Sequence, residues 1–96
     1  MNQDFHNEES LLQAIQMGPQ FKKLDALEAL YELTNDKHID LFLSMLKDKD
    51  WHIRRTAGIA VAKMLGACAK EHLTPLLNDR AYGVREDIRK AIEEYC

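Results

Sequence analysis

The sequence contains few of the residues that break helices or cross-link chains. Its 96 residues include only two prolines, four glycines and two cysteines, and the scarcity of β-branched residues favours helices over strands. No apolar run approaches the ~20 residues that span a bilayer. The amino-terminal MNQDFHNEES also lacks the basic and apolar regions of a signal peptide. We therefore expect a single helical domain located in the cytoplasm, with no membrane segment.

The two cysteines, Cys68 and Cys96, are far apart in the sequence and match no metal-binding motif. They could pair in principle, but a reducing cytosol favours free thiols.

The sequence also lacks a concentrated positive charge. The formal net charge is -3, with ten acidic and five basic side chains in residues 1–50 and six acidic and eight basic ones in residues 51–96. Nucleic-acid-binding domains usually carry a dense basic face. The composition therefore argues against a nucleic-acid partner.

Motifs for catalysis and for metal binding are missing as well. No two of the four histidines, His6, His38, His52 and His72, have the i, i+3 or i, i+4 spacing of a helical metal pair. The chain has no glycine-rich phosphate loop and no serine elbow. We expect neither an enzyme nor a bound metal or cofactor.

A helical apolar stripe, by contrast, occurs three times at a constant offset of 31 residues. Within Asp50 to Met64, the apolar residues fall at i, i+4, i+7, i+8 and i+11, which places them on one side of an α-helix. The stripe comprises Ile53, Ala57, Ala60, Val61 and Met64; it recurs as Val84, Ile88, Ala91, Ile92 and Tyr95, and in part as Ala26, Ala29, Leu30 and Leu33. Such repetition is the signature of a repeat protein.

Turn and capping residues divide the chain into six helices. We expect the six helices to begin after a cap at Asn7 or Ser10, at Pro19, near Ile39, after a cap at Asp50, near Ala69 and near Ala81. Gly66 should end the fourth helix. The fifth helix should cover residues 69–77 and be kinked by Pro75. The helices pair into units of about residues 8–34, 36–65 and 69–96. A lone helical pair cannot bury its stripe, so the sequence predicts an all-α solenoid of three stacked helical hairpins.

Two segments of the chain resemble a known family of repeats. The segments DKDWHIRRTA, from Asp48, and DRAYGVREDI, from Asp79, are similar to short bacterial HEAT repeats, which also occur in bilin-lyase subunits and in many scaffold proteins. The family pattern is matched by Asp48, Ile53, Arg54, Ala57, Ala60 and Val61, and by Asp79, Val84, Arg85, Ile88, Ala91 and Ile92. The first unit departs from it, with Met17 in place of the aspartate and Lys22 in place of the aliphatic residue.

The resemblance implies a non-catalytic adaptor or scaffold whose second helices line a concave face that binds a partner protein or peptide. It leaves two alternatives open. One is a lyase-like subunit that handles a tetrapyrrole through Cys68 or a histidine, and the other is a weak nucleic-acid binder. The His-Glu dipeptides of iron-binding HEAT enzymes are missing from the sequence.

Lys23, Arg54 and Arg85 occupy the same position in successive second helices. The resemblance implies a structural ladder in which Arg54 and Arg85 donate hydrogen bonds to the turn aspartates Asp48 and Asp79. The alternative is a basic stripe that binds phosphate or an acidic peptide.

Trp51 and Tyr82 also lie 31 residues apart, at the start of their helices. Their repetition favours packing over the seam between hairpins, and the alternative is an exposed anchor for a partner.

The side of each second helix opposite the stripe is the expected partner site. A rotation of 100° per residue places Gly58 and Glu28 there, together with Leu24, Leu27, Tyr31, Arg55, Ile59, Ala62, Glu86, Arg89, Lys90 and Glu93. The predicted surface grades from apolar to charged along the chain. The amino-terminal segment could instead cover its apolar part through Phe5, and Tyr95 could support a homodimer through the carboxyl-terminal end.

Overall fold

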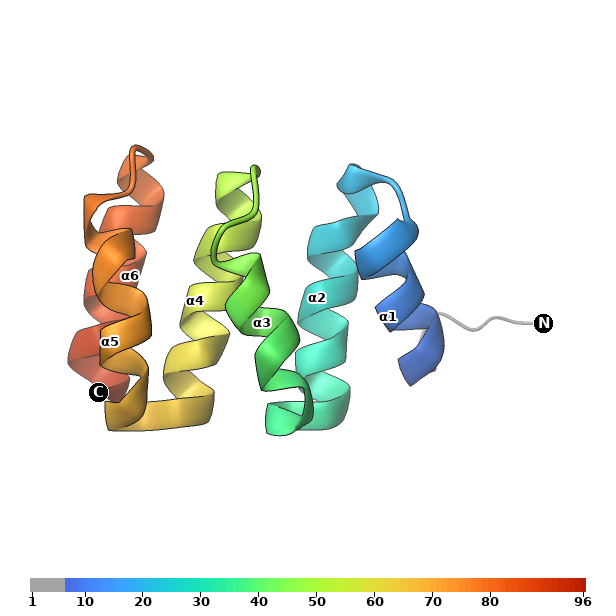
Figure 1. Cartoon of the computed structure of the whole chain (residues 1–96), viewed down its shortest axis with the longest axis horizontal. Coiled ribbons are helices and arrows are strands. Elements are labelled where there is room, and N and C mark those ends of the chain that lie inside the picture. The colour runs from blue at the N-terminus through green and yellow to red at the C-terminus, as the bar shows by residue number, and fades with distance from the viewer. Residues whose placement is uncertain (1–6) are drawn as a thin grey trace. The chain divides into compact units, whose positions relative to one another are not determined.

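The computed structural model describes residues 7–96, and within this range every regular element is a helix (Figure 1). The prediction of an all-α fold is confirmed. The chain divides into two compact units, with the boundary between Lys37 and His38. No described helix is both long and apolar enough to traverse a bilayer.

Unit 1 consists of α1 (Glu8–Met17) packed on α2 (Gln20–Thr34). Asn7 caps α1, because its side-chain oxygen accepts hydrogen bonds from the backbone amides of Glu9 (2.8 Å) and Ser10 (3.3 Å). Asn7 is therefore the N-cap, and the alternative cap at Ser10 is wrong. Gly18 and Pro19 separate the two helices as expected.

The buried stripe of α2 differs from the one that the repeat predicts. Ala26, Leu27 and Leu30 are buried, whereas Ala29 is half-buried and Leu33 is 50% exposed. The prediction that Leu33 belongs to the core is therefore wrong. Burial of Leu27 removes more apolar area from water than burial of Ala29, which favours turning the helix toward Leu27.

The segment η1 (Asn35–His38) crosses the boundary between the two units. In chain order, unit 2 then contains α3 (Ile39–Met45), α4 (Trp51–Leu65), η2 (Gly66–Ala69), α5 (Lys70–Leu73), η3 (Thr74–Asn78) and α6 (Tyr82–Tyr95). In this unit α3 packs on α4, α5 and η3 pack on α6, and α4 lies beside α6 (Figure 1). Helix α4 is thus covered on more than one side.

The expected boundaries of α4 are confirmed by its caps. The Asp50 side chain accepts a hydrogen bond of 2.9 Å from the His52 amide. Gly66 ends the helix with φ = 58°, in the region where a side chain is disfavoured.

The expected fifth helix, residues 69–77, is broken into pieces. Only Lys70–Leu73 is α-helical, and η2 and η3 flank it. Pro75 has no amide hydrogen, so the i to i−4 pattern cannot continue through it. The Lys70 carbonyl accepts from both the amide and the hydroxyl of Thr74, the latter at 2.7 Å, just before this interruption.

The core of unit 2 follows the predicted stripes. The largest fully buried side chains there are Phe42, Ile53, Val61, Leu73, Val84 and Ile88. Ala57, Ala60 and Ala91 are buried as expected, while Met64, Ile92 and Tyr95 are half-buried. Phe42 and Leu73, 31 residues apart, occupy equivalent buried places, so the repeat describes unit 2 well.

Candidate functional site

The residues predicted to face a partner fall into three classes of exposure. Leu27 and Ala62 are fully buried, and this corrects their assignment to an exposed face. Leu24, Tyr31, Arg55, Ile59 and Glu86 are half-buried, and Arg89, Lys90 and Glu93 are exposed. The same helical side therefore has different environments in different helices.

Packing of α4 against α6 explains the burial of Ala62. Gly58 lies one turn before Ala62 on the same side of α4, and a Cβ atom on Gly58 would overlap Cδ1 of Ile88 in α6. It would also lie 3.3 Å from Cδ1 of Leu76. This side of α4 meets other helices, and small residues permit the close approach. The helical period of the sequence identifies one packed side of α4, so it cannot predict that a second side is also buried.

Arg55 and Ile59 remain on the outward side of α4. The Arg55 guanidinium lies 3.6 Å from the Asp87 carboxylate of α6 and 5.7 Å from the centroid of the Trp51 ring. Asp87 was not among the predicted site residues, because an ion pair between two helices leaves no signal in the spacing of either helix. Ile59 is half-buried, one turn after Arg55 on the same helix.

The outward side of α6 carries an ion-pair cluster centred on Arg89. Its guanidinium donates at 2.8 Å to Glu86 and at 2.8 Å to Glu93. The hydrogen bonds that Glu86 accepts from Arg89, the negative charges of Glu86 and Glu93, and the hydrogen bond that Glu93 accepts raise the pKa of Arg89. The hydrogen bond from Arg89 likewise lowers the pKa of Glu86. Because the pairs are internal to one helix face and solvated, a partner would have to displace or share them.

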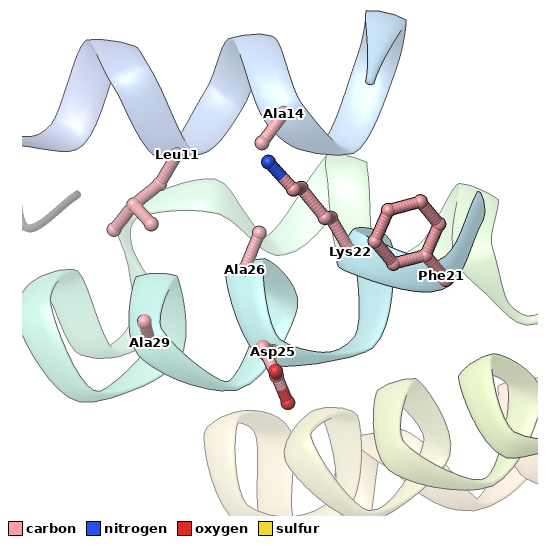
Figure 2. Close-up of a pocket in the computed structure, with 7 residues that line it drawn as sticks. All are labelled: Leu11, Ala14, Phe21, Lys22, Asp25, Ala26 and Ala29. Carbon is pink, nitrogen blue, oxygen red and sulfur yellow. The ribbon is translucent and has the colours of Figure 1, made fainter. Parts of the chain in front are cut away.

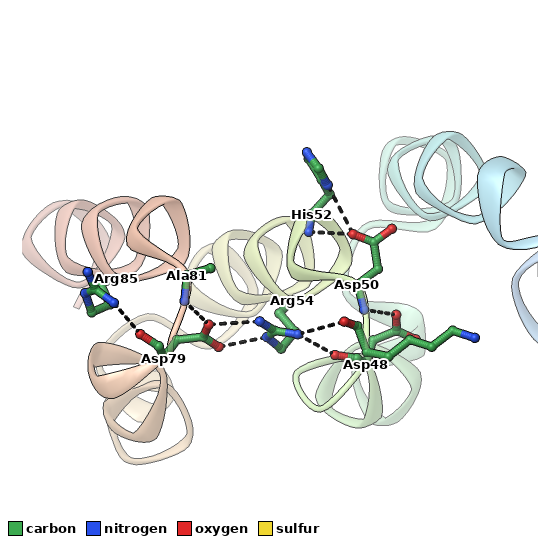
Figure 3. Close-up of polar contacts among 8 residues, drawn as sticks. Asp48, Asp50, His52, Arg54, Asp79, Ala81 and Arg85 are labelled. Atoms are coloured by element: carbon green, nitrogen blue, oxygen red, sulfur yellow. Dashed lines mark hydrogen bonds and ion pairs between the residues drawn. The ribbon is translucent and has the colours of Figure 1, made fainter.

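Arg54 links the turn before α4 to the turn before α6 (Figure 3). Its Nε donates to Asp79 Oδ2 at 2.7 Å and its Nη2 to Asp79 Oδ1 at 2.9 Å, a bidentate pair. Its Nη1 donates to the backbone oxygens of Asp48 (2.9 Å) and Lys49 (3.2 Å). The side chains of Arg54 and Asp79 are only 9% and 7% exposed. The Arg54 guanidinium is therefore buried and hydrogen-bonded to both turns, which leaves no exposed donor for a phosphate.

The other members of the ladder have different partners. Arg85 donates to the backbone oxygen of Asp79 at 2.7 Å, and the Asp48 carboxylate accepts from the Asp50 amide at 3.0 Å. The hydrogen bond with Asp79 raises the pKa of Arg54 despite its burial, and the same bond lowers the pKa of Asp79. Asp79 is thus held as a carboxylate by its buried partner.

This arrangement of paired helices and bridged turns agrees with a family comparison. The model of the family described as HEAT repeats matches residues 8–93 of the chain. The chain belongs to the HEAT-repeat family. No curated protein and no solved structure matches this HEAT-repeat chain significantly.

The two repeated aromatic residues of the HEAT units differ in packing. The Trp51 ring lies over Gly83 of α6, where a Cβ atom would come within 2.8 Å of its Cζ3, and Trp51 is 36% exposed. The ring also stacks on His52 at 3.8 Å between centroids. Tyr82 is 69% exposed, with the Arg85 guanidinium 5.7 Å from its ring centroid. Trp51 therefore covers the contact between α4 and α6, and Tyr82 remains largely in solvent.

Unit 1 contains an apolar pocket that the sequence reading did not identify. It lies between α1 and α2, with Leu11 and Ala14 facing Ala26 and Ala29 and with Phe21 at one end (Figure 2). Lys22 and Asp25 complete its lining, and its volume is about 390 Å³. Met17 and Phe21, on either side of the Gly18-Pro19 break, are 77% and 78% exposed. Two large apolar residues flanking a helix break were the available sequence signal.

Neither a metal site nor the suggested amino-terminal cover can be assigned from the geometry. Within residues 7–96, no group of three or more His, Cys, Asp or Glu side chains is placed to hold a metal ion. Phe5, suggested as a cover for the apolar surface, lies outside the described residues.

Proposed function

We propose that this chain is a non-catalytic HEAT-repeat module, built of three stacked helical hairpins, that binds a partner protein or peptide. The observation that carries the proposal is the exposed apolar surface of unit 1. Phe21 lines an apolar pocket of about 390 Å³ and is largely exposed to solvent, as is Met17 on the other side of the helix break. Contiguous apolar surface of this kind is typical of interaction sites.

The chemistry of the pocket indicates what its partner presents. Leu11, Ala14, Ala26 and Ala29 offer only apolar contacts, and the groove runs between two helices. An apolar side chain from a helix or an extended peptide would fit it, while Lys22 and Asp25 would orient a polar flank. Complete burial of one large apolar side chain contributes about 1.5–3 kcal/mol, so Phe21 is the expected anchor.

The outward side of α4 and α6 is the second surface in the proposal. There Ile59 is half-buried and lies one turn from Arg55, which pairs with Asp87, and this supports a weaker, more polar contact than the pocket of unit 1. Leu27 and Ala62 do not contribute to either surface because they are buried.

A paired substitution distinguishes the two surfaces. Phe21→Asp and Ile59→Asp each replace an apolar side chain by a carboxylate, one in each unit, so each variant serves as the control for the other. Affinity capture from native lysate, followed by a titration of the captured protein, should show binding weakened about 10- to 100-fold by Phe21→Asp. Unfolding monitored by circular dichroism verifies that both variants remain folded.

The outcomes of this comparison are distinct. Loss of the partner with Phe21→Asp, together with retention by Ile59→Asp, supports the pocket of unit 1. The reverse pattern moves the contact to α4 and α6. Equal binding by wild type and both folded variants would refute the proposal that either surface carries the function.

A further inference from the structure

The two cysteines of unit 2 are brought to the same end of the unit. Cys68 lies in η2 and Cys96 directly follows α6, and both are exposed free thiols. Segment η2 contacts α6, and a Cβ atom on Gly66 would lie 3.7 Å from the Tyr95 carbonyl oxygen. Figure 1 places the C end of the chain beside the turn that joins α4 to α5. Residues 28 positions apart in the sequence thus come together through the fold.

Chain geometry limits how far apart the thiols can be. Cys68 is two residues beyond Gly66, and Cys96 is one residue beyond Tyr95. With standard backbone dimensions, their α-carbons are separated by no more than about 14 Å. A disulfide requires about 4.4–6.8 Å between α-carbons, so the two residues have to approach each other by at most about 7 Å.

The two sides of this pair differ in how firmly they are held. Ala69, next to Cys68, is fully buried and anchors η2. Lys63 Nζ lies 5.9 Å from the centroid of the Tyr95 ring, which keeps the last turn of α6 beside the last turn of α4. Cys96 itself lies beyond the helix, with its amide donating to the Ile92 carbonyl at 3.0 Å. Cys96 is the C-cap residue of α6, so a movement toward Cys68 has to break this one hydrogen bond.

We propose that Cys68 and Cys96 form a reversible intramolecular disulfide by exchange with a low-molecular-weight disulfide. One cysteine, as its thiolate, attacks a sulfur of the small disulfide and releases one small thiol, leaving a mixed disulfide on the protein. The second cysteine then attacks the protein sulfur of that mixed disulfide and releases the second small thiol. The protein loses two S–H bonds and gains one S–S bond, and the small disulfide is reduced to two thiols.

The cross-link would fasten the last turn of α6 to the turn between α4 and α5. The closed loop spans residues 68–96 and includes α5, η3 and α6. Closing such a loop restricts the unfolded chain and stabilises the folded unit. The thiol pair would therefore stabilise the end of unit 2 under oxidising conditions, at a place far in sequence from the pocket of unit 1.

The test uses the full chain at low micromolar concentration in graded mixtures of oxidised and reduced glutathione. The expected product is a monomer about 2 Da lighter than the reduced chain, with no thiol reactive toward an alkylating reagent. Its thermal midpoint should rise by about 5 °C or more and return when the disulfide is reduced. Cys68→Ser and Cys96→Ser change exposed side chains, so both should fold normally and lose the shift.

Two results would overturn the proposal. The first is wild-type protein that accumulates glutathione adducts on both cysteines, each in the same amount as in the single variants. The second is oxidation that gives only covalent dimers, which would mean that the thiols meet between chains and not within one.

Discussion

Helices α4 and α6 carry equivalent residues 31 positions apart, yet the same side of each helix has opposite surroundings. In α4 this side holds Gly58 and Ala62, which are small and buried, whereas in α6 it holds Arg89 and Glu93, which are charged and exposed. Gly58 meets Ile88 of α6, and Arg89 pairs with Glu86 and Glu93 of its own helix. The comparison shows that a repeat sets the orientation of a helix, and its neighbours decide which sides are covered.

The equivalent arginines show the same contrast. Arg54 is buried and bridges two turns through four hydrogen bonds to Asp79, Asp48 and Lys49. Arg85 is half-buried and donates one described hydrogen bond, to the backbone of Asp79. The arginine at this repeat position therefore joins two turns in α4, whereas in α6 it makes a single described hydrogen bond.

The largest effect is expected from breaking the Arg54 bridge. Arg54→Ala would leave the Asp79 carboxylate buried without its cation, which typically costs about 3–5 kcal/mol of unfolding free energy. Trp51 is the single tryptophan and lies in unit 2, so its fluorescence during urea unfolding reports this unit. Arg54→Lys should fall between wild type and Arg54→Ala, since an ammonium cannot form the bidentate pair.

Arg85→Ala is the matched control for that measurement. It removes an arginine from the same repeat position and one hydrogen bond, so we expect a loss of about 1 kcal/mol. Equal losses for Arg54→Ala and Arg85→Ala would show that burial does not distinguish the two positions.

The next effect concerns the side of α4 that packs on α6. Gly58→Leu places in α4 the residue that α2 carries at the equivalent position, Leu27. Its side chain would collide with Ile88 and Leu76, and overpacking should cost about 3 kcal/mol. The check is again urea unfolding observed through Trp51 fluorescence.

Arg89→Leu introduces the same residue, leucine, into α6 at the position equivalent to Gly58. Because Arg89 is exposed and its ion pairs are solvated, the urea midpoint should hardly change. A loss as large as that for Gly58→Leu would mean that this side of α6 is packed, contrary to its exposure in the structure.

The elements and most of the core could be predicted from the sequence because they depend on local rules. The 3.6-residue period places Ile53, Val61, Val84 and Ile88 in the core, and the caps at Asp50 and Gly66 follow from hydrogen bonding and from φ preference. Pro75 signalled an interruption, although the helix is broken more completely than a kink. These features need no knowledge of which helices are neighbours.

The surface was harder to predict because it depends on contacts between helices. Leu27 and Ala62 were placed on an open face by a count that treated each second helix as covered on one side. The Arg55–Asp87 pair and the pocket between α1 and α2 each require two elements to be positioned together. The first unit was also the most divergent copy, so the repeat gave no guide to the exposure of Phe21 or Leu33.

A further effect is expected from the pH dependence of the Arg54–Asp79 pair. The hydrogen bond from Arg54 lowers the pKa of Asp79 in the folded protein, so the carboxylate binds its proton more readily when unfolded. Its stabilisation is therefore fully present above the unfolded pKa of about 3.9, and it is lost as the pH falls through the lower folded pKa.

Asp79→Asn keeps the size of the side chain and removes this titration. At neutral pH the variant should be less stable than wild type by about 2 kcal/mol, since a hydrogen bond to a charged group is lost or weakened. The difference should shrink as the pH falls below about 4, because protonated Asp79 resembles asparagine in charge. Urea unfolding across this range measures the difference in unfolding free energy directly. The contributions of the other carboxylates cancel, because both proteins contain them. A difference that stays constant with pH would show that the asparagine disrupts packing, and that the charge of Asp79 is not what joins the turn before α4 to the turn before α6.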